Sequence, residues 1–195
     1  MEQRRLKGAK VAILVTQDFE QVEMTEPRKA LEYEWADTIL IAPEPGEVQG
    51  MRHDEKADLF PVELTLAEAD PSEFDALLLP GGALNADELR VDPRARAFAR
   101  EMDRAGKPIA AICHAPWLLV SAGLVRGRTL TSYHTLQDDI RCAGGSWVDR
   151  EVARDGNWVT SRQPKDIAAF NKAMIGLFGE PRVAREQDPG AARAR

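Results

Sequence analysis

Four short apolar runs limit what this chain can fold into more than any other feature does. The runs are AKVAILV (9–15), DTILIA (37–42), FDALLLP (74–80) and KPIAAI (107–112). Strands that are apolar throughout are buried on both faces, which is typical of parallel sheets. Segments with helical character lie between the runs, and this alternation predicts a three-layer α/β domain with a mainly parallel sheet.

The segments between the runs carry helix and turn signals. Asp92 as N-cap, Pro93 in the first turn and a glycine at the end predict a helix over 92–106. We also expect long helices at about 22–35 and 164–178, and short ones after Cys113 and over LQDDIRCAG. PEPGEVQGMRHDEKADLF (43–60) is polar and turn-rich, so it predicts a loop or short hairpin outside the main sheet.

Length and charge narrow the functional classes. The chain has 195 residues, the size of one domain, which we place at 1–180; residues 181–195 lack apolar periodicity and predict a disordered tail. The net charge of −6 argues against nucleic acid as a partner. No run approaches the ~20 apolar residues of a membrane span. We expect a cytoplasmic protein with no membrane partner.

The two cysteines and three histidines have no metal-ligand or disulfide spacing, so we expect neither a metal nor a cofactor. In open parallel sheets, ligands bind at the carboxyl ends of the strands. Three informative stretches lie there: QDFE after the first strand, PGG after the third and CHAP after the fourth. Because all three stretches follow strands of the predicted sheet, we expect the functional site at the carboxyl ends of these strands.

Cys113 lies between a buried strand and the start of a helix. There the helix dipole and free backbone N–H groups would favour the reactive thiolate. The alternative is a small buried hydrophobic residue, as most free cysteines are, and position alone does not separate the two. Cys142 lies on a helix without such surroundings, so we interpret it as structural.

Residues near Cys113 could assist it. The His114 ring is a candidate base, and its backbone N–H a candidate oxyanion donor. Gly81 and Gly82 either bring backbone N–H groups to a developing anion or only end the strand. Neither a Walker lysine nor a G-x-G-x-x-G pattern accompanies them, which argues against nucleotide binding. Glu20 shares its stretch with Glu23 and Glu26, and by itself the pattern favours solvated surface carboxylates.

Taken together, several motifs resemble those of the PfpI-like intracellular protease family. The motifs are QDFEQVEM, LLLPGG, AAICHAP, GRTLTSYHTLQDDI, WVDREV and DGNWVTSRQPKDIAAF, in order from about Lys10 to Phe178. This family lies in the class I glutamine-amidotransferase-like superfamily, with the Parkinson-linked deglycase and bacterial general stress proteins. The resemblance implies a flavodoxin-like sandwich with a cysteine nucleophile elbow, and a homodimer or a larger ring such as a hexamer.

The resemblance also implies roles for individual residues. Cys113 matches the nucleophile, Glu20 the acid that hydrogen-bonds the thiol, and the backbone of Gly82 and His114 the oxyanion pocket. Asp87 matches an acid that crosses a subunit interface in proteolytic members, with Glu88 as the alternative.

Two positions depart from the family pattern. Ala115 replaces the common glycine after Cys-His, and His134 replaces a proline after Ser132-Tyr133. His134 either enters the pocket beside Tyr133 or only fills a loop.

The function implied is a stress-response, cysteine-dependent enzyme. Its substrates would be reactive carbonyls or their protein adducts, in glyoxalase or deglycase chemistry, with peptides second, as in an intracellular protease. The alternative is a non-catalytic redox sensor whose Cys113 is oxidised to sulfenic or sulfinic acid. A flavodoxin-like ligand-binding module is a third and remote interpretation.

Overall fold

The computed structural model describes residues 4–180, and its main feature is a seven-stranded sheet. The strand order is β11-β12-β8-β7-β1-β3-β6, and all neighbours pair in parallel except β11 with β12. The strands are β1 (Lys10–Leu14), β3 (Asp37–Ala42), β6 (Leu64–Thr65), β7 (Ala76–Leu79), β8 (Ile109–Ile112), β11 (Val152–Asp155) and β12 (Trp158–Ser161). The predicted, mainly parallel sheet is confirmed.

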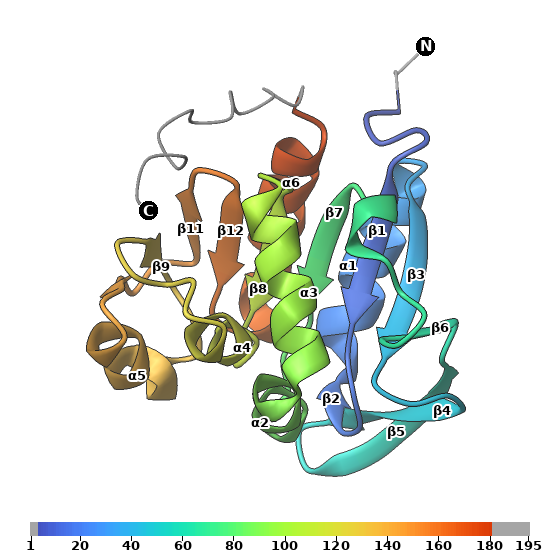
Figure 1. Cartoon of the computed structure of the whole chain (residues 1–195), viewed down its shortest axis with the longest axis horizontal. Helices are drawn as coiled ribbons and strands as arrows, with labels where there is room; N and C mark the ends of the chain where they lie inside the picture. The colour runs from blue at the N-terminus through green and yellow to red at the C-terminus, as the bar shows by residue number, and fades with distance from the viewer. Residues whose placement is uncertain (1–3, 181–195) are drawn as a thin grey trace, which may run out of the picture.

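Helices cover both faces of this sheet, as Figure 1 shows for α3 in front of it and α1 behind. The helices are α1 (Gln21–Tyr33), α2 (Ala83–Val91), α3 (Pro93–Arg104), α4 (Pro116–Ser121), α5 (Gln137–Cys142) and α6 (Ile167–Phe178). Three 3-10 turns accompany them: Pro71–Glu73, His134–Leu136 and Pro164–Asp166.

Each buried strand divides its side chains between two cores because neighbouring residues point to opposite faces. In β1, Ala12 and Leu14 pack with residues of α3, α4 and α5, whereas Val11 and Ile13 pack with residues of α1 and α6. Both sets are fully buried, which explains why β1 is apolar at every position from Val11 to Leu14.

A smaller sheet stands at the carboxyl end of the main one. It consists of β2 (Phe19–Glu20), β4 (Glu47–Arg52) and β5 (Glu55–Pro61), and the last two form an antiparallel hairpin. The prediction of a hairpin outside the main sheet is therefore confirmed. A further pair, β9 (Thr129–Leu130) and β10 (Ser146–Trp147), lies beside α5.

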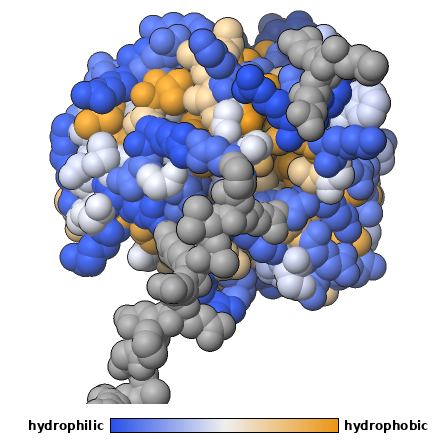
Figure 2. Space-filling view, turned by 90° about the horizontal axis from the view of Figure 1, so that it is seen from above, coloured by the Kyte–Doolittle hydropathy of each residue, from blue (hydrophilic) through white to orange (hydrophobic). Residues whose placement is uncertain are grey.

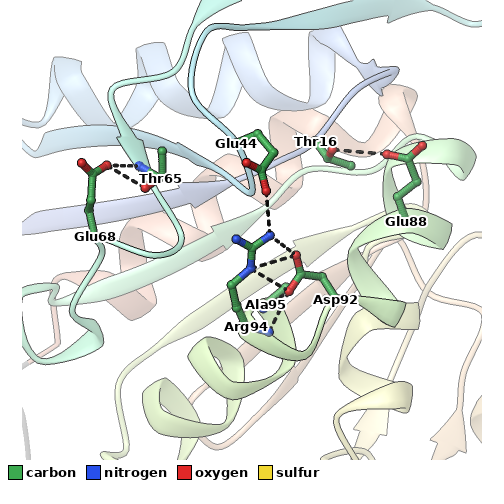
Figure 3. Close-up of polar contacts among 8 residues, drawn as sticks. All are labelled: Thr16, Glu44, Thr65, Glu68, Glu88, Asp92, Arg94 and Ala95. Carbon is green, nitrogen blue, oxygen red and sulfur yellow. Dashed lines mark hydrogen bonds and ion pairs between the residues drawn. The ribbon is translucent and has the colours of Figure 1, made fainter.

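The start of α3 is capped as the sequence predicts. The Asp92 side chain accepts hydrogen bonds from the Arg94 and Ala95 amides (2.7 and 3.4 Å), and the Arg94 guanidinium also reaches Glu44 at 3.1 Å (Figure 3). The helix before it, α2, was not predicted, because Pro80-Gly81-Gly82 was interpreted as an anion-binding turn or as the end of a strand and not as the start of a helix. Gly82, with a φ of 97°, is in fact the N-cap of α2.

The parallel strands of the main sheet point toward the small sheet in Figure 1, whereas the antiparallel β11 points away from it. Figure 2 shows the opposite end of the molecule, which is mainly hydrophilic. Within residues 4–180 no helix is long and apolar enough to cross a membrane. The tail predicted at 181–195 lies outside the described residues.

Candidate active site

Cys113 occupies a strained turn directly after β8. Its φ is 63°, a left-handed conformation that few residues other than glycine adopt. Two backbone hydrogen bonds hold the turn: the Cys113 amide donates to Ser161 O (3.1 Å), and its carbonyl accepts from the Tyr133 amide (2.7 Å). Helix α4 begins three residues later at Pro116. This is the cysteine elbow that the sequence predicted.

The elbow faces a cavity of about 520 Å³ at the carboxyl end of the sheet, between the main sheet and the β4–β5 hairpin. The following residues line it: Asp18, Glu20, Glu23, Met51, His53, Asp54, Gly82, Ala83, Leu84, Cys113, His114, Tyr133, Gln163 and Pro164. The cavity is large enough for a small metabolite or for one side chain of a larger substrate.

Two backbone amides point at the Cys113 sulfur. The N–H groups of Gly82 and His114 donate toward it, which lowers the pKa of the thiol. A side chain at residue 82 would prevent this approach, because a Cβ atom there would lie 2.8 Å from Asp18 O and 2.7 Å from Glu20 N. The geometry thus supplies the two donors expected of an anion pocket.

The carboxyl group beside the thiol belongs to Glu23. It contacts the Cys113 side chain and the Gly81 backbone, is fully buried, and has neither oxygen in a hydrogen bond of standard geometry. Burial, followed by the charge of Glu20, raises the pKa of Glu23 to about 8. Glu23 is therefore mostly a neutral carboxylic acid at pH 7.

Glu20, which we expected to hydrogen-bond the thiol, is placed elsewhere. It is the N-cap residue of α1, and one oxygen accepts a hydrogen bond from the His53 amide at 3.1 Å. Glu20 precedes α1, whereas Glu23 lies on the buried face of that helix. Only the carboxyl group of Glu23 therefore reaches the turn at Cys113. Glu20 instead lines the cavity and holds the hairpin tip against it.

The thiol is more enclosed than the sequence suggested. Cys113 is only 6% exposed, and burial, together with the negative charge of Glu23 when ionised, raises its pKa well above the ordinary value. The two amides act in the opposite direction but do not outweigh burial. Formation of the thiolate therefore depends on a neutral Glu23 and on a base within reach.

His114 provides such a base. Its Nδ1 lies 3.2 Å from the Cys113 sulfur, and its Nε2 lies 3.4 Å from the Thr135 hydroxyl. Burial, with a further contribution from His134, lowers the pKa of His114, so its ring is neutral at pH 7. A neutral imidazole can accept the thiol proton. The ring and the backbone N–H of His114 thus both face the Cys113 sulfur.

Tyr133 and His134 differ in their relation to the cavity. Tyr133 lines it and stacks on the His114 ring, with ring centroids 4.6 Å apart. His134 is exposed, is not among the lining residues, and packs against the outer side of Tyr133 at 4.5 Å. It reaches the site only through its effect on the His114 pKa.

The remaining candidates lie outside the cavity of their own chain. Asp87 is 56% exposed on α2 and is paired with Arg90 at 2.8 Å. Glu88 bonds the Thr16 hydroxyl at 3.3 Å (Figure 3). Cys142 is exposed at the end of α5, and Gly81 contacts Glu23 rather than the sulfur.

Sequence reasoning missed the hairpin's contribution. His53 and Asp54 lie at the tip between β4 and β5, and Gln163 follows β12 at the same end of the sheet. The strand-end rule could have identified Gln163, whereas the tip residues reach the cavity only through long-range packing. In residues 4–180 no group of three or more His, Cys, Asp or Glu side chains is arranged to hold a metal ion.

Comparison with known proteins gives one consistent result. The profile of the DJ-1/PfpI family matches residues 9–177. A deglycase from Pyrococcus horikoshii is 42% identical over 169 residues, covering 87% of this chain and 99% of the relative. A protein/nucleic acid deglycase from Escherichia coli K12 is 40% identical over 172 residues, covering 87% and 98%.

Solved structures agree with the sequence comparison. A two-domain protein from Anabaena variabilis, with a DJ-1/ThiJ/PfpI-like and a ferritin-like domain, superimposes with a TM-score of 0.82 at 32% identity. The match covers 88% of this chain and 48% of that one. The predicted family and the flavodoxin-like fold are confirmed, and the names of the two relatives above fall in the deglycase class that we expected.

Proposed function

Because the chain belongs to the DJ-1/PfpI family, we propose that it is a stress-response, cysteine-dependent enzyme that acts on reactive carbonyls or their adducts. The observation that carries this proposal is the convergence of four groups on one sulfur. These groups are the His114 ring, the backbone amides of Gly82 and His114, and the buried carboxyl group of Glu23.

The first step is attack by the thiol on a carbonyl carbon. His114 Nδ1, 3.2 Å away and neutral, takes the thiol proton. A C–S bond forms, and the electron pair of the C=O bond moves to oxygen. The Gly82 and His114 amides, which point at the sulfur, are near enough to donate to this oxygen.

The second step requires an acid, and Glu23 suits it. With a pKa of about 8 it carries a proton at pH 7. It can donate that proton to the new alkoxide or hydrogen-bond it without adding negative charge to the pocket. For a dicarbonyl, the proton on the thiol-bound carbon then moves to the neighbouring carbonyl carbon through an enediol, which oxidises the first carbon, reduces the second and leaves a thioester. Water hydrolyses this thioester to the 2-hydroxy acid and returns the thiol. The cysteine is regenerated, so turnover needs no redox partner.

The burial of the sulfur favours small substrates. Cys113 is 6% exposed within a cavity of about 520 Å³, so a dicarbonyl or a single modified side chain can reach it. A peptide would have to enter as an extended strand. We therefore place reactive carbonyls and their adducts before peptides.

The redox-sensor alternative receives less support from the site. Oxidation is fastest at exposed thiols of low pKa. Here the thiol is enclosed, and burial raises its pKa.

A second copy of the chain is part of the proposal. Asp87 lies on α2 with the exposed side chains of Leu84 (60%) and Val91 (63%), outside the cavity of its own chain. In a homodimer built on this face, Asp87 would approach the neighbouring site as a third acid.

The test is turnover of methylglyoxal and of its adduct with N-acetyl-lysine, followed by lactate formation. The comparison includes Cys113→Ser and, as matched control, Cys142→Ser. We expect lactate from the wild type and from Cys142→Ser, and at least a 10³-fold lower rate from Cys113→Ser, as for loss of a covalent nucleophile.

Three results would contradict this function. Equal rates in the wild type and Cys113→Ser would exclude Cys113 as the nucleophile. Cleavage of an unmodified peptide without lactate formation would indicate a protease. Stoichiometric oxidation of Cys113 by peroxide, with no turnover of either substrate class, would indicate a sensor.

A further inference from the structure

The described residues that line the cavity include several carboxylates and neither lysine nor arginine. Besides the buried Glu23, the lining residues include Asp18, Glu20 and Asp54. Among the described residues, neither Asp18 nor Asp54 forms an ion pair with a cation, and Glu20 has only the exposed His53 ring, 3.9 Å away. The neutral His114 ring adds no positive charge. The charge of the described cavity lining is therefore negative, and the cations Lys29 and Arg52 line the adjoining hollow, which shares Glu20 and His53 with the cavity.

These carboxylates line the same cavity as the reacting sulfur. Asp18 and Glu20 belong to the segment that packs against Gly82, whose amide donates toward Cys113. The negative charge of Glu20 also acts on the buried Glu23, because it contributes to the raised pKa of the Glu23 carboxyl group. Asp54 is exposed at the hairpin tip, which the Glu20–His53 hydrogen bond holds against the cavity.

At the buried end of the same cavity, the Glu23 carboxyl group lacks the hydrogen-bond partners that a ligand could supply. Both Glu23 carboxyl oxygens lack a protein hydrogen-bond partner of standard geometry although the side chain is fully buried and lines the cavity. A buried polar group normally finds a partner, and a substrate oxygen at this position would provide one. A polar substrate atom would thus lie at the bottom of the cavity, with the three carboxylates around its exit.

We propose that Asp18, Glu20 and Asp54 select substrates by charge, so that Cys113 reacts with carbonyls and adducts carrying a positive charge in preference to anionic ones. This deepens the proposed function, because it specifies which substrates the same site takes. A cationic group extending from the cavity gains electrostatic attraction, and an anionic group is repelled. Cationic adducts of amines fit this site, whereas anionic oxoacids do not.

The test measures charge selection at the sulfur without depending on turnover. Three methanethiosulfonates differ in charge: trimethylammonioethyl (positive), hydroxyethyl (neutral) and sulfonatoethyl (negative). Each transfers its thio group to a cysteine thiolate, forming a mixed disulfide and releasing methanesulfinate. Rates at Cys113 are read by peptide mass spectrometry, and the exposed Cys142 is the internal reference.

We expect the ratio of cationic to anionic rate at Cys113 to exceed the same ratio at Cys142 by about 30-fold at low ionic strength. High salt should reduce this difference. Glu20→Gln and Asp54→Asn should each lower it about threefold. The matched control is Asp37→Asn, which changes the net charge equally at the opposite end of the sheet and should leave the ratio unchanged.

Equal ratios of cationic to anionic rate at Cys113 and Cys142 would overturn charge selection. So would an Asp37→Asn variant that lowers the ratio as much as Glu20→Gln does. The outcome is separate from that of the lactate assay. Charge selection without turnover would refute the proposed enzyme while preserving the anionic entrance, and turnover without charge selection would do the reverse.

Discussion

A Cβ atom on Gly81 would collide with the carboxylate of Glu23. It would also lie 2.6 Å from the Cys113 Cβ atom and 2.9 Å from Ile112 O, so it would meet both the backbone and the cysteine side chain. The backbone of Gly81 does not have a positive φ, so this glycine is required by space rather than by conformation. The close packing of Glu23 on the elbow depends on that missing side chain.

Gly81→Ala therefore tests whether this packing sets the geometry of the site. We expect a loss of about 1–3 kcal/mol in unfolding free energy, as for overpacking, and a loss of Cys113 reactivity. Denaturant unfolding and alkylation kinetics measure the two effects. Gly176→Ala in α6 is the matched control: no atom lies within 4 Å of its Cβ position, and we expect a gain of about 0.5–1 kcal/mol. A stable, fully reactive Gly81→Ala variant would disprove the argument.

Glu23→Gln should change the pH dependence of activity. The pKa of Glu23 is about 8 in the folded protein, so above that pH its charge opposes the thiolate and it no longer donates a proton. We expect the wild-type rate to fall above about pH 8 and the variant to lack this basic limb, at a lower maximal rate. The midpoint of Cys113 alkylation should also move to lower pH in the variant. An unchanged basic limb would assign it to another group.

The same carboxyl group makes stability depend on pH. Its pKa rises from 4.5 to about 8 on folding, so the folded state binds more protons than the unfolded state between these values. Unfolding free energy should therefore decrease as pH rises from 4.5 to 8, by up to about 5 kcal/mol for this buried group. Denaturant titrations of the wild type and Glu23→Gln would measure this. The variant should lack that slope, and parallel slopes would contradict the assignment.

His134→Gln should raise the pKa of His114. Burial is the larger cause of the lowered His114 pKa and would remain, whereas the contribution of His134 would disappear. NMR titration of the His114 ring should show its midpoint moving up, and the acid limb of the pH–rate profile should move with it. His53→Gln is the matched control because His53 is not among the causes of the lowered pKa. No movement in His134→Gln would show that the two rings do not interact.

How far the sequence predicted the site is clearest from its two glutamates. Cys113, Gly82 and His114 were identified because strand ends and an elbow are local patterns. Glu20 was assigned the place of Glu23, although Glu23 is spaced four and eight residues from Pro27 and Leu31 on the buried face of α1. That helical spacing could have distinguished the two acids.

Other features were beyond local reasoning. Asn85 is fully buried and bonds the Thr16 amide at 2.8 Å, a contact between residues 69 apart in sequence. The raised pKa of Cys113 reflects how completely the elbow is covered, which depends on the whole fold. Sequence patterns therefore predicted the layers of the fold and the position of Cys113 at the end of a strand, but not the electrostatic surroundings of its thiol.

Asp103→Ala should separate stability from the chemistry at Cys113. On α3, Asp103 accepts hydrogen bonds from Trp158 Nε1 (2.8 Å), Arg128 Nη2 (2.9 Å) and Asn157 Nδ2 (3.2 Å). Both charged partners are largely buried, with 16% and 17% of the Asp103 and Arg128 side chains exposed. Removing the acceptor takes the hydrogen bond from Trp158 Nε1 and the nearest carboxylate from the largely buried Arg128, whereas Arg128 Nη2 keeps Asn157 Oδ1 (3.1 Å) and Asn157 Nδ2 keeps Lys107 O (2.9 Å). We expect a loss of about 3 kcal/mol.

Thermal unfolding should register this loss as a fall of about 6–12 °C in Tm. Asp138→Ala is the matched control, because that side chain is 86% exposed and its ion pair with Arg141 should contribute less than about 0.5 kcal/mol. Alkylation of Cys113 below the unfolding transition should be the same in both variants, since Asp103 lines no part of the cavity. A change in Cys113 reactivity in Asp103→Ala alone would mean that this network also positions the elbow, through the pairing of β12 with β8.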